Sequence, residues 1–571
     1  MRLSGLRTNR PGLLVSKWNH STARFFVSIV FGAIAFLVSV GPQVLNIRNT
    51  RWLLVGDTAT YYLTWEFFRK TPVFQWPLGA NPNFGVGFDS SIVFSDSIPL
   101  VALIMKPLGK LLSGDLQYFG WWILLCFVLQ AFFALKVLSL LNVTFVVQLA
   151  VLPLFLLQPS LLDRLSFDGY GHLALSAHWL ILAAFSLFLA LRTTHLHWLL
   201  LVVLSIGINF YLFVIVGIFM LSWALVRVYK SSRRAHTLIS EVIWGMAAVA
   251  ISLVFLLVLD GLNSRSFSDS GLGLYRTTLL SLIDSGTPTG QTWSQILTFL
   301  QLSTPKGGQE GFGFIGAGVV VFVLVAVAFS LRNPRMQALV PLVPLGIVAG
   351  FFFILALSPR VAVTERELFT YPLPPLIEQT IGVVRATGRF IWVPMYFLMV
   401  VAIVVVAVRL KGKPKVLLAL SLCAVLFQLV DSRVAITETR SRFTDTKPML
   451  ITDDPFWDEI AKGRSHLVSI PPLNNDPRWI DLAVFALRND MSTNAAYLSR
   501  KDELNFQALV ASTQQLLERR EFEDDTVYVL TNYPPNPETQ KLFAEQNAGT
   551  LTNFRVVQIE ELTVVYAVTP G

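Results

Sequence analysis

The sequence is poor in charged residues and almost free of cysteine. Asp, Glu, Lys and Arg make up only 14% of its 571 residues and hydrophobic residues make up 54%, whereas soluble globular proteins carry about 25% charged residues. This composition excludes an ordinary cytosolic enzyme, and it excludes intrinsic disorder, which requires low hydrophobicity and high charge. Two cysteines, Cys126 and Cys423, are too few for a small disulfide scaffold. The remaining class is a membrane protein.

Long apolar runs follow one another along most of the chain. A bilayer core about 30 Å thick is crossed by about 20 apolar helical residues. We expect eleven spans, at residues 26–46, 119–141, 143–161, 173–191, 198–212, 213–229, 239–259, 313–331, 337–357, 390–409 and 415–430. The stretch from 198 to 228 is divided near Asn209 because it is long for a single span. The first run follows basic residues, as a cleaved signal peptide does, but its apolar core exceeds the usual length of about 7–15 residues, so we expect it to be retained.

Basic residues lie in alternate loops between these runs. They are Arg2 to Arg24, Arg192, Arg227 to Arg234, Arg332 with Arg335, and Arg409 to Lys415. Lys and Arg favour cytoplasmic loops, and all of these loops are cytoplasmic if the N-terminus is. Membrane orientation thus accounts for the net charge of +9, and we expect no nucleic-acid partner. We predict a multi-pass protein of the inner (plasma) membrane, with membrane lipids around it and outer loops at 47–118, 162–172, 260–312 and 358–389.

The composition becomes that of a soluble domain after Asp431. Apolar β-rich runs and one helix-like run follow, at 466–470, 527–530, 556–568 and 506–521. The predicted fold is an α-helical polytopic membrane protein with a C-terminal soluble α/β or α+β domain. Its regions are a basic cytoplasmic N-terminus at 1–25, a membrane domain at 26–430 with a large first outer loop at 47–118, and an extracytoplasmic domain at 431–571.

Polar side chains gather in the outer loops, where a site is to be sought. Asp57 stands just beyond the first span, and Asp96 follows in the same loop. An acid followed by an amphipathic aromatic helix can hold a carboxylate at the water–lipid boundary, where an amphiphilic substrate arrives. The same residues also suit an interfacial aromatic belt with solvated acids. Residues 97–112 are apolar but contain Lys106, and we expect them to lie along the outer membrane surface.

Two further outer loops carry candidate residues. Asp168 and His172 are four apart and would share a helix face, so the carboxylate can orient the imidazole, although a polar helix entrance explains them equally well. His178 lies inside an apolar run, as a functional group or as a neutral, hydrogen-bonded histidine. Arg385 and Arg389 form a fork at a helix entrance that suits a phosphate, with lipid-headgroup anchoring as the alternative.

Several outer-loop segments carry a family resemblance. They are Gly56-Asp57, residues 76–82 and 91–100, Gly171-His172-Leu173-Ala174, Ala177-His178-Trp179 and Gly388-Arg389-Phe390. Over residues 26–400 the chain resembles the C-type (GT-C fold) membrane glycosyltransferases, and more closely a bacterial family of multi-span membrane proteins grouped with them. Such enzymes use a lipid-linked sugar donor, typically a polyprenyl-phosphate sugar, and an acid in the first extracytoplasmic loop.

The resemblance implies roles for the candidate residues. Asp57 would be the general base that deprotonates an acceptor hydroxyl, with Asp96 as a second catalytic candidate, and Arg385 and Arg389 would stabilise the phosphate leaving group. Metal binding, acceptor orientation or support of Asp57 would fall to Asp96, Asp168, His172 and His178. Many C-type enzymes have paired acids in this loop, whereas here Thr58 follows a single Asp57. Whether a divalent cation is a cofactor therefore stays open.

We thus expect a hexosyl- or pentosyltransferase that moves a sugar from a polyprenyl-phosphate-linked donor to a cell-envelope glycan, lipid or protein on the outer face of the membrane. The C-terminal domain would bind or orient the acceptor. A transporter or flippase of lipid-linked saccharides is the first alternative, and it predicts ionisable residues along mid-membrane helices and two repeated halves. A non-catalytic scaffold for envelope enzymes is the second.

Overall fold

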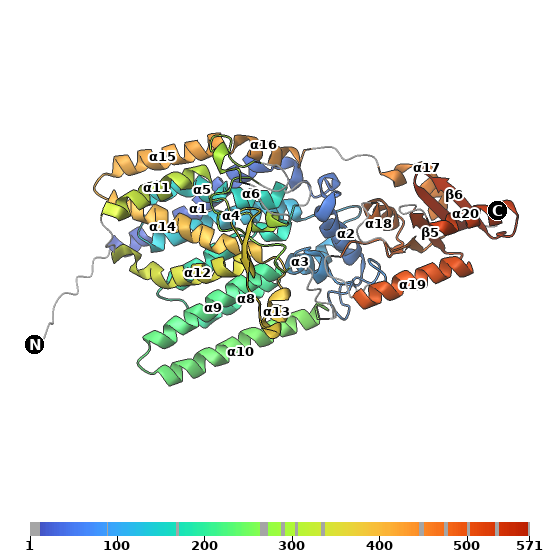
Figure 1. Cartoon of the computed structure of the whole chain (residues 1–571), viewed down its shortest axis with the longest axis horizontal. Helices are drawn as coiled ribbons and strands as arrows, with labels where there is room; N and C mark the ends of the chain where they lie inside the picture. Colours follow the sequence, from blue (N-terminus) through green and yellow to red (C-terminus); the bar gives the residue numbers. More distant parts are fainter. Residues whose placement is uncertain are drawn as a thin grey trace, which may run out of the picture.

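A bundle of apolar helices and a smaller α/β domain occupy the two ends of the molecule, with elements of the predicted first outer loop between them (Figure 1). The computed structural model describes residues 12–87, 90–166, 171–262, 272–286, 292–302, 307–332, 337–444, 450–472, 478–498, 503–531 and 536–568. All statements below concern these residues.

The described helices confirm a polytopic membrane protein. Seven are long and apolar enough to cross a membrane: Thr22–Ser39 within α1 (Gly12–Ser39), α4 (Phe119–Leu140), α9 (Phe210–Lys230), α10 (Arg234–Val258), Leu339–Leu357 with α12 (Val343–Leu357), Thr387–Arg409 with α14 (Trp392–Arg409), and α15 (Pro414–Asp431). An eighth is bent by 41° between α5 (Phe145–Leu156) and α6, which begins at Pro159 and ends at Ser166. Three shorter apolar helices complete the bundle: Leu173–Leu189 with α7 (Trp179–Leu189), α8 (His195–Ile206) and α11 (Ala317–Arg332). Each expected span thus has an apolar helix, but a count of eleven full-length spans is not confirmed.

Local backbone conformation and capping explain where the first span ends and where α8 and α9 are divided. The first span ends at Ser39 rather than at residue 46, because Gly41 has a φ of +94° and Pro42 cannot continue the helical hydrogen bonds. The Asn209 side chain accepts a hydrogen bond from the backbone N–H of Tyr211 at 2.9 Å and caps α9. Near the opposite ends of α8 and α9, Arg227 Nη1 lies 3.2 Å from His195 Nε2. The two helices are therefore antiparallel neighbours, which confirms the division near Asn209.

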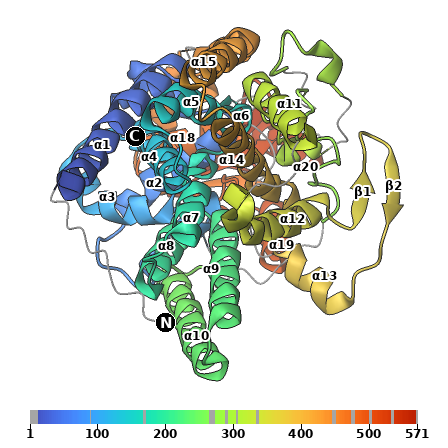
Figure 2. The same ribbon diagram turned by 90° about the vertical axis from the view of Figure 1, so that its left-hand side faces the viewer.

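The basic loops and the elements of the predicted outer loops lie at opposite ends of the bundle. The connections from α9 to α10 and from α14 to α15, which carry many of the basic residues, lie far from the C-terminal domain (Figure 1). A view along the bundle shows a small hairpin and a short helix projecting beyond it on one side (Figure 2). These are β1 (Arg360–Ala362), β2 (Glu367–Thr370) and α13 (Pro375–Gly382).

The C-terminal domain is a three-layer α/β unit. Its sheet has the order β4-β3-β5-β7-β6, from β3 (His466–Ile470), β4 (Ser492–Thr493), β5 (Thr526–Thr531), β6 (Phe554–Ile559) and β7 (Leu562–Ala567). β3 runs parallel to β4 and β5, whereas β7 is antiparallel to β5 and β6. Helices α17 (Pro455–Ala461) and α18 (Trp479–Arg488) pack on one face, and α19 (Glu503–Arg519) and α20 (Pro537–Asn547) on the other. The run at 556–568 is a hairpin rather than one strand, because Glu560 takes a positive φ of 48° between β6 and β7.

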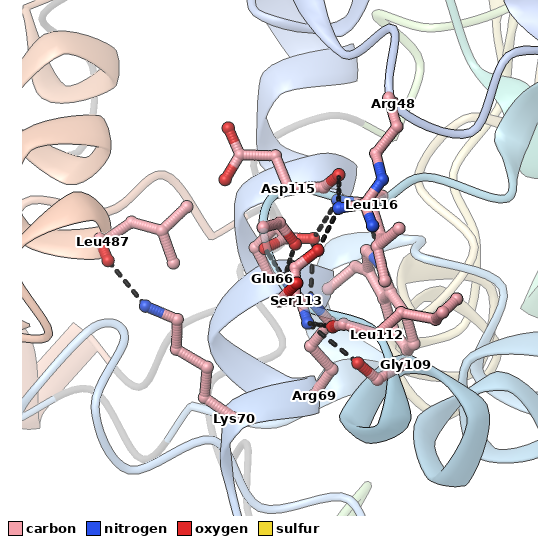
Figure 3. A network of polar contacts seen from close by, with 12 residues as sticks. Arg48, Glu66, Arg69, Lys70, Gly109, Leu112, Ser113, Asp115, Leu116 and Leu487 are labelled. Carbon is pink, nitrogen blue, oxygen red and sulfur yellow. Dashed lines mark hydrogen bonds and ion pairs between the residues drawn. The ribbon is translucent and has the colours of Figure 1, made fainter.

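In the first outer loop, α2 (Gly56–Lys70) is held by a buried ion pair. The Glu66 carboxylate accepts two hydrogen bonds from Arg69, both of 2.8 Å, and a third from the backbone N–H of Leu116 at 2.9 Å. Arg69 in turn donates to the carbonyl of Gly109 at 2.9 Å (Figure 3) and to that of Gly114 at 2.5 Å. The network fixes α2 against α3 (Pro99–Leu111) and the chain that leads to α4.

One face of α3 is apolar and exposed. Ile104, Leu108 and Leu111 follow the i, i+4, i+7 spacing and are 62%, 51% and 81% exposed. Gly109 faces α2, since a Cβ there would lie 3.2 Å from Trp65. This pattern is typical of a helix that rests on a membrane surface, and that placement stays a prediction.

Candidate functional site

Asp57 lies in the first turn of α2, at the end of the bundle that faces the C-terminal domain. Its side chain is 26% exposed, and His172 Nδ1, 3.7 Å from Oδ2, is its ion-pair neighbour among the described residues. Burial raises the pKa of the carboxyl group above its ordinary value. Glu310 and Asp96 raise it further by charge repulsion, while His172 and Arg389 act in the opposite direction. Asp57 is thus a stronger base than a solvated aspartate.

His172 joins Asp57 to a second acid. Its Nδ1 is 2.9 Å from the hydroxyl of Tyr61, which lies one helical turn after Asp57 on α2. Its Nε2 is 3.4 Å from Oε1 of Glu310. The imidazole therefore stands between two carboxylates and is oriented by a tyrosine.

Glu310 is the centre of a buried ion cluster. Its Oε2 accepts hydrogen bonds from Arg389 Nε at 2.8 Å and from Arg164 Nη1 at 2.9 Å, and Arg164 also pairs with Asp163 at 2.6 Å. Burial acts to raise the pKa of Glu310, but Arg389, His172 and Arg164 hold it well below its usual range. This charged cluster contacts His172 through Glu310, and His172 in turn contacts Asp57.

Two glycines allow this cluster to form. Gly311 follows Glu310, and Gly388 precedes Arg389. A Cβ on Gly388 would lie 2.7 Å from the Cα of Gly311, closer than real Cβ contacts. Because neither residue has a side chain, the two backbones touch and bring the carboxylate within reach of the guanidinium.

The two arginines of the expected fork do different things. Arg389 is buried in the 3-10 helix Thr387–Ile391, bonded to Glu310 and packed 4.3 Å from the ring centre of Tyr211. Arg385 precedes that helix, is only partly buried, and lies 6.0 Å from the ring centre of Tyr275. No described acid pairs with Arg385. Both arginines precede α14, and whether they act together on a phosphate at this helix entrance stays a prediction.

The remaining candidates are dispersed. Asp96 has a left-handed backbone, with φ of 51°, and accepts a hydrogen bond from Asn209 at 3.0 Å. It lies close enough to Asp57 to raise the pKa of that carboxyl group. His178 is buried in the helix bundle, with Nδ1 3.0 Å from the Tyr396 hydroxyl, which matches the hydrogen-bonded alternative.

Asp168 lies outside the described residues, so its pairing with His172 is a prediction that the structure leaves open. His172 itself precedes the 3-10 helix Leu173–Ser176 and is not on an α-helix. The helix face on which that pairing was argued is therefore absent at His172.

The described residues do not offer a metal site. No group of three or more His, Cys, Asp or Glu side chains among them is arranged to hold an ion. Glu310 is already engaged by two arginines and Asp96 by an amide.

Sequence reasoning missed Glu310 and Tyr61. Tyr61 carried a usable signal, since a residue four positions after Asp57 must share its helix face. Glu310 carried little, because it lies 146 residues from Arg164 and 79 from Arg389 along the chain.

The fold is that of a polytopic helical membrane protein with a C-terminal α/β domain, and its candidate site joins acids, a histidine and arginines. A family model described as "Domain of unknown function (DUF6311)" matches residues 29–433, and one described as "DUF6311 C-terminal domain" matches residues 456–566. The chain belongs to this family.

Among solved structures, the chain is similar to the archaeal oligosaccharyltransferase AglB from Archaeoglobus fulgidus, in complex with an inhibitory peptide and a dolichol-phosphate. The identity is 12% and the TM-score 0.40, and the match covers 90% of this chain and 70% of that one. A search of curated proteins found no matching sequence.

Proposed function

We propose that this protein is a membrane glycosyltransferase, which transfers a sugar from a polyprenyl-phosphate carrier to a cell-envelope acceptor at the outer face of the inner membrane. The observation that carries the proposal is that a partly exposed carboxylate, Asp57, and Arg385, with which no described acid pairs, both lie near enough to Tyr497 for their charges to act on it. Sugar transfer from a phosphate carrier needs a base for the acceptor and positive charge for the leaving phosphate. The resemblance of the outer-loop motifs to C-type glycosyltransferases favours the same reaction class.

The proposed chemistry uses the groups in their observed positions. Asp57 takes the proton of an acceptor hydroxyl as its oxygen bonds to the anomeric carbon. The bond from that carbon to the phosphate oxygen breaks, and the electron pair leaves with the phosphate, which Arg385 neutralises. Because a carboxylate is a modest base, most of the rate comes from holding donor and acceptor in register. The cluster around Glu310 keeps His172 and Arg389 in place for that purpose.

The test compares Asp57→Asn with wild type in cells that lack the chromosomal copy, at equal membrane abundance. Loss of the base is expected to slow transfer by a factor of about 10² to 10⁴. Mass spectrometry of the envelope should then show one sugar missing and its lipid-linked donor accumulated. Asp115→Asn is the matched control. Asp115 is an exposed acid of the same loop, and Figure 3 shows no hydrogen bond or ion pair from its carboxylate to the residues drawn there.

An unchanged profile for Asp57→Asn, where deletion of the whole protein alters it, would contradict the proposal. Lipid-linked saccharide trapped on the cytoplasmic side would then favour a flippase. Sensitivity to loss of residues 431–571 alone would favour a scaffold.

A further inference from the structure

The C-terminal domain is fastened to the first outer loop by backbone hydrogen bonds. The N–H of Thr493, in β4, donates to the carbonyl of Asn83 at 3.0 Å, and its carbonyl accepts from Gly85 at 2.9 Å and Val86 at 3.0 Å. Thr493 is 1% exposed. Phe84 thus forms an isolated parallel β-bridge with Thr493 of β4, which is an edge strand of the sheet.

Side chains strengthen the same junction. Lys70, the last residue of α2, donates to the carbonyl of Leu487 at 2.6 Å (Figure 3). It also pairs with Asp490 at 2.6 Å. The ring of Phe84 stacks on Phe67 of α2 at 5.0 Å and meets Trp479 of α18 at 6.3 Å. Since α2 also carries Asp57, the domain is held in fixed register with the candidate base.

Tyr497 lies four residues beyond this anchor, in the same domain. Its ring stacks on Trp479 with centroids 6.5 Å apart, and it is partly buried. The charges of Asp57 and Arg385 both act on its hydroxyl, although the two residues come from distant outer loops. No described residue forms a hydrogen bond with that hydroxyl. The Tyr497 hydroxyl is thus near both charges and has no hydrogen-bond partner among the described residues.

We propose that Tyr497 is a positioning residue of the transfer site, and that it binds a saccharide acceptor. The inference rests on the proposed function and extends it by naming the acceptor class and the residue that holds it. A tyrosine combines an apolar ring face with one hydroxyl, which matches the C–H face and hydroxyl groups of a sugar ring. Stacking on Trp479 limits the motion of the ring, so little entropy is lost on binding. The acceptor hydroxyl is thereby presented to Asp57.

The test separates binding from chemistry. Membranes that hold the full-length chain and endogenous donor are incubated with increasing amounts of envelope glycan extracted from the deletion strain, which is the probe. Tyr497→Phe keeps the ring and is expected to raise the apparent KM for this glycan by about 3- to 10-fold, the value of one hydrogen bond. Tyr497→Ala is expected to raise it further, with the limiting rate little changed. Tyr566→Phe, in β7 of the same domain, is the matched control and should leave both parameters unchanged.

The outcomes distinguish this inference from the proposed function. A wild type that transfers no sugar, with Asp57→Asn identical to it, defeats the proposed function. Transfer that needs Asp57 but shows the wild-type KM in Tyr497→Ala overturns the role of Tyr497. So does a fall in limiting rate without a change in KM, which indicates a structural role. Transfer only to the protein or lipid fraction of the same cells overturns the saccharide class.

Discussion

At the scale of single residues, the pH at which activity falls on the acidic side should depend on the charged groups around Asp57. The proposed base must be deprotonated, so activity rises with pH through a pKa that burial and neighbouring acids raise above the ordinary value of about 3.9. Glu310→Gln removes one of those negative charges and releases Arg389 from its partner. Both changes lower the pKa of Asp57 and should move the acidic limb of kcat/KM to lower pH.

The control for this prediction is Glu367→Gln, which breaks an outer-loop pair with Arg276 at 2.8 Å and should not move the limb. The profile is measured with the glycan transfer assay from about pH 3 to 8, around the ordinary range of carboxyl groups. A limb that stays in place or moves upward in Glu310→Gln would show that Glu310 does not act on the base.

At the scale of elements, the position of α2 depends on the buried pair Glu66–Arg69. The Glu66 side chain is fully buried and that of Arg69 is 9% exposed. Arg69→Met leaves a buried carboxylate without its partner and should destabilise the protein by about 3–5 kcal/mol. Thermal unfolding in detergent, followed by tryptophan fluorescence, measures the change.

Arg519→Met is the matched substitution in an exposed ion pair. Arg519 Nη1 lies 3.8 Å from Glu521 Oε1, and the two side chains are 65% and 62% exposed. It should cost at most about 1 kcal/mol. Equal shifts in the two variants would mean that the network in Figure 3 does not hold α2.

The positions of helices and strands were the features that the sequence predicted best. The apolar runs each coincided with an apolar helix among the described residues, since lipid forces backbone hydrogen bonds to close within a segment. The runs at 466–470 and 527–530 matched β3 and β5, because strands buried on both faces read as continuous apolar stretches. The split of 556–568 was missed, since a two-residue turn of glutamates lacks the usual glycine or asparagine signal.

At the scale of the whole molecule, the site was predictable only in part. Asp57 and His172 were found because each stands at the edge of a span. Their partners depend on tertiary contacts that no local pattern encodes. Glu310 contacts Arg389 because the backbones of Gly311 and Gly388 approach each other closely. Tyr497 belongs to the C-terminal domain, which is joined to the first loop by the β-bridge between Phe84 and Thr493. Asp57 thus lies where the membrane bundle and the C-terminal domain meet.

The most direct test of the central claim is the side of the membrane on which Asp57 acts. Intact spheroplasts, labelled in their lipid-linked sugars, are given the extracted envelope glycan, which cannot cross the membrane. We predict that cells with the wild-type chain label the added glycan without lysis and that Asp57→Asn cells do not. Labelling that requires lysed spheroplasts, or that persists unchanged in Asp57→Asn, would contradict transfer by this residue at the outer face.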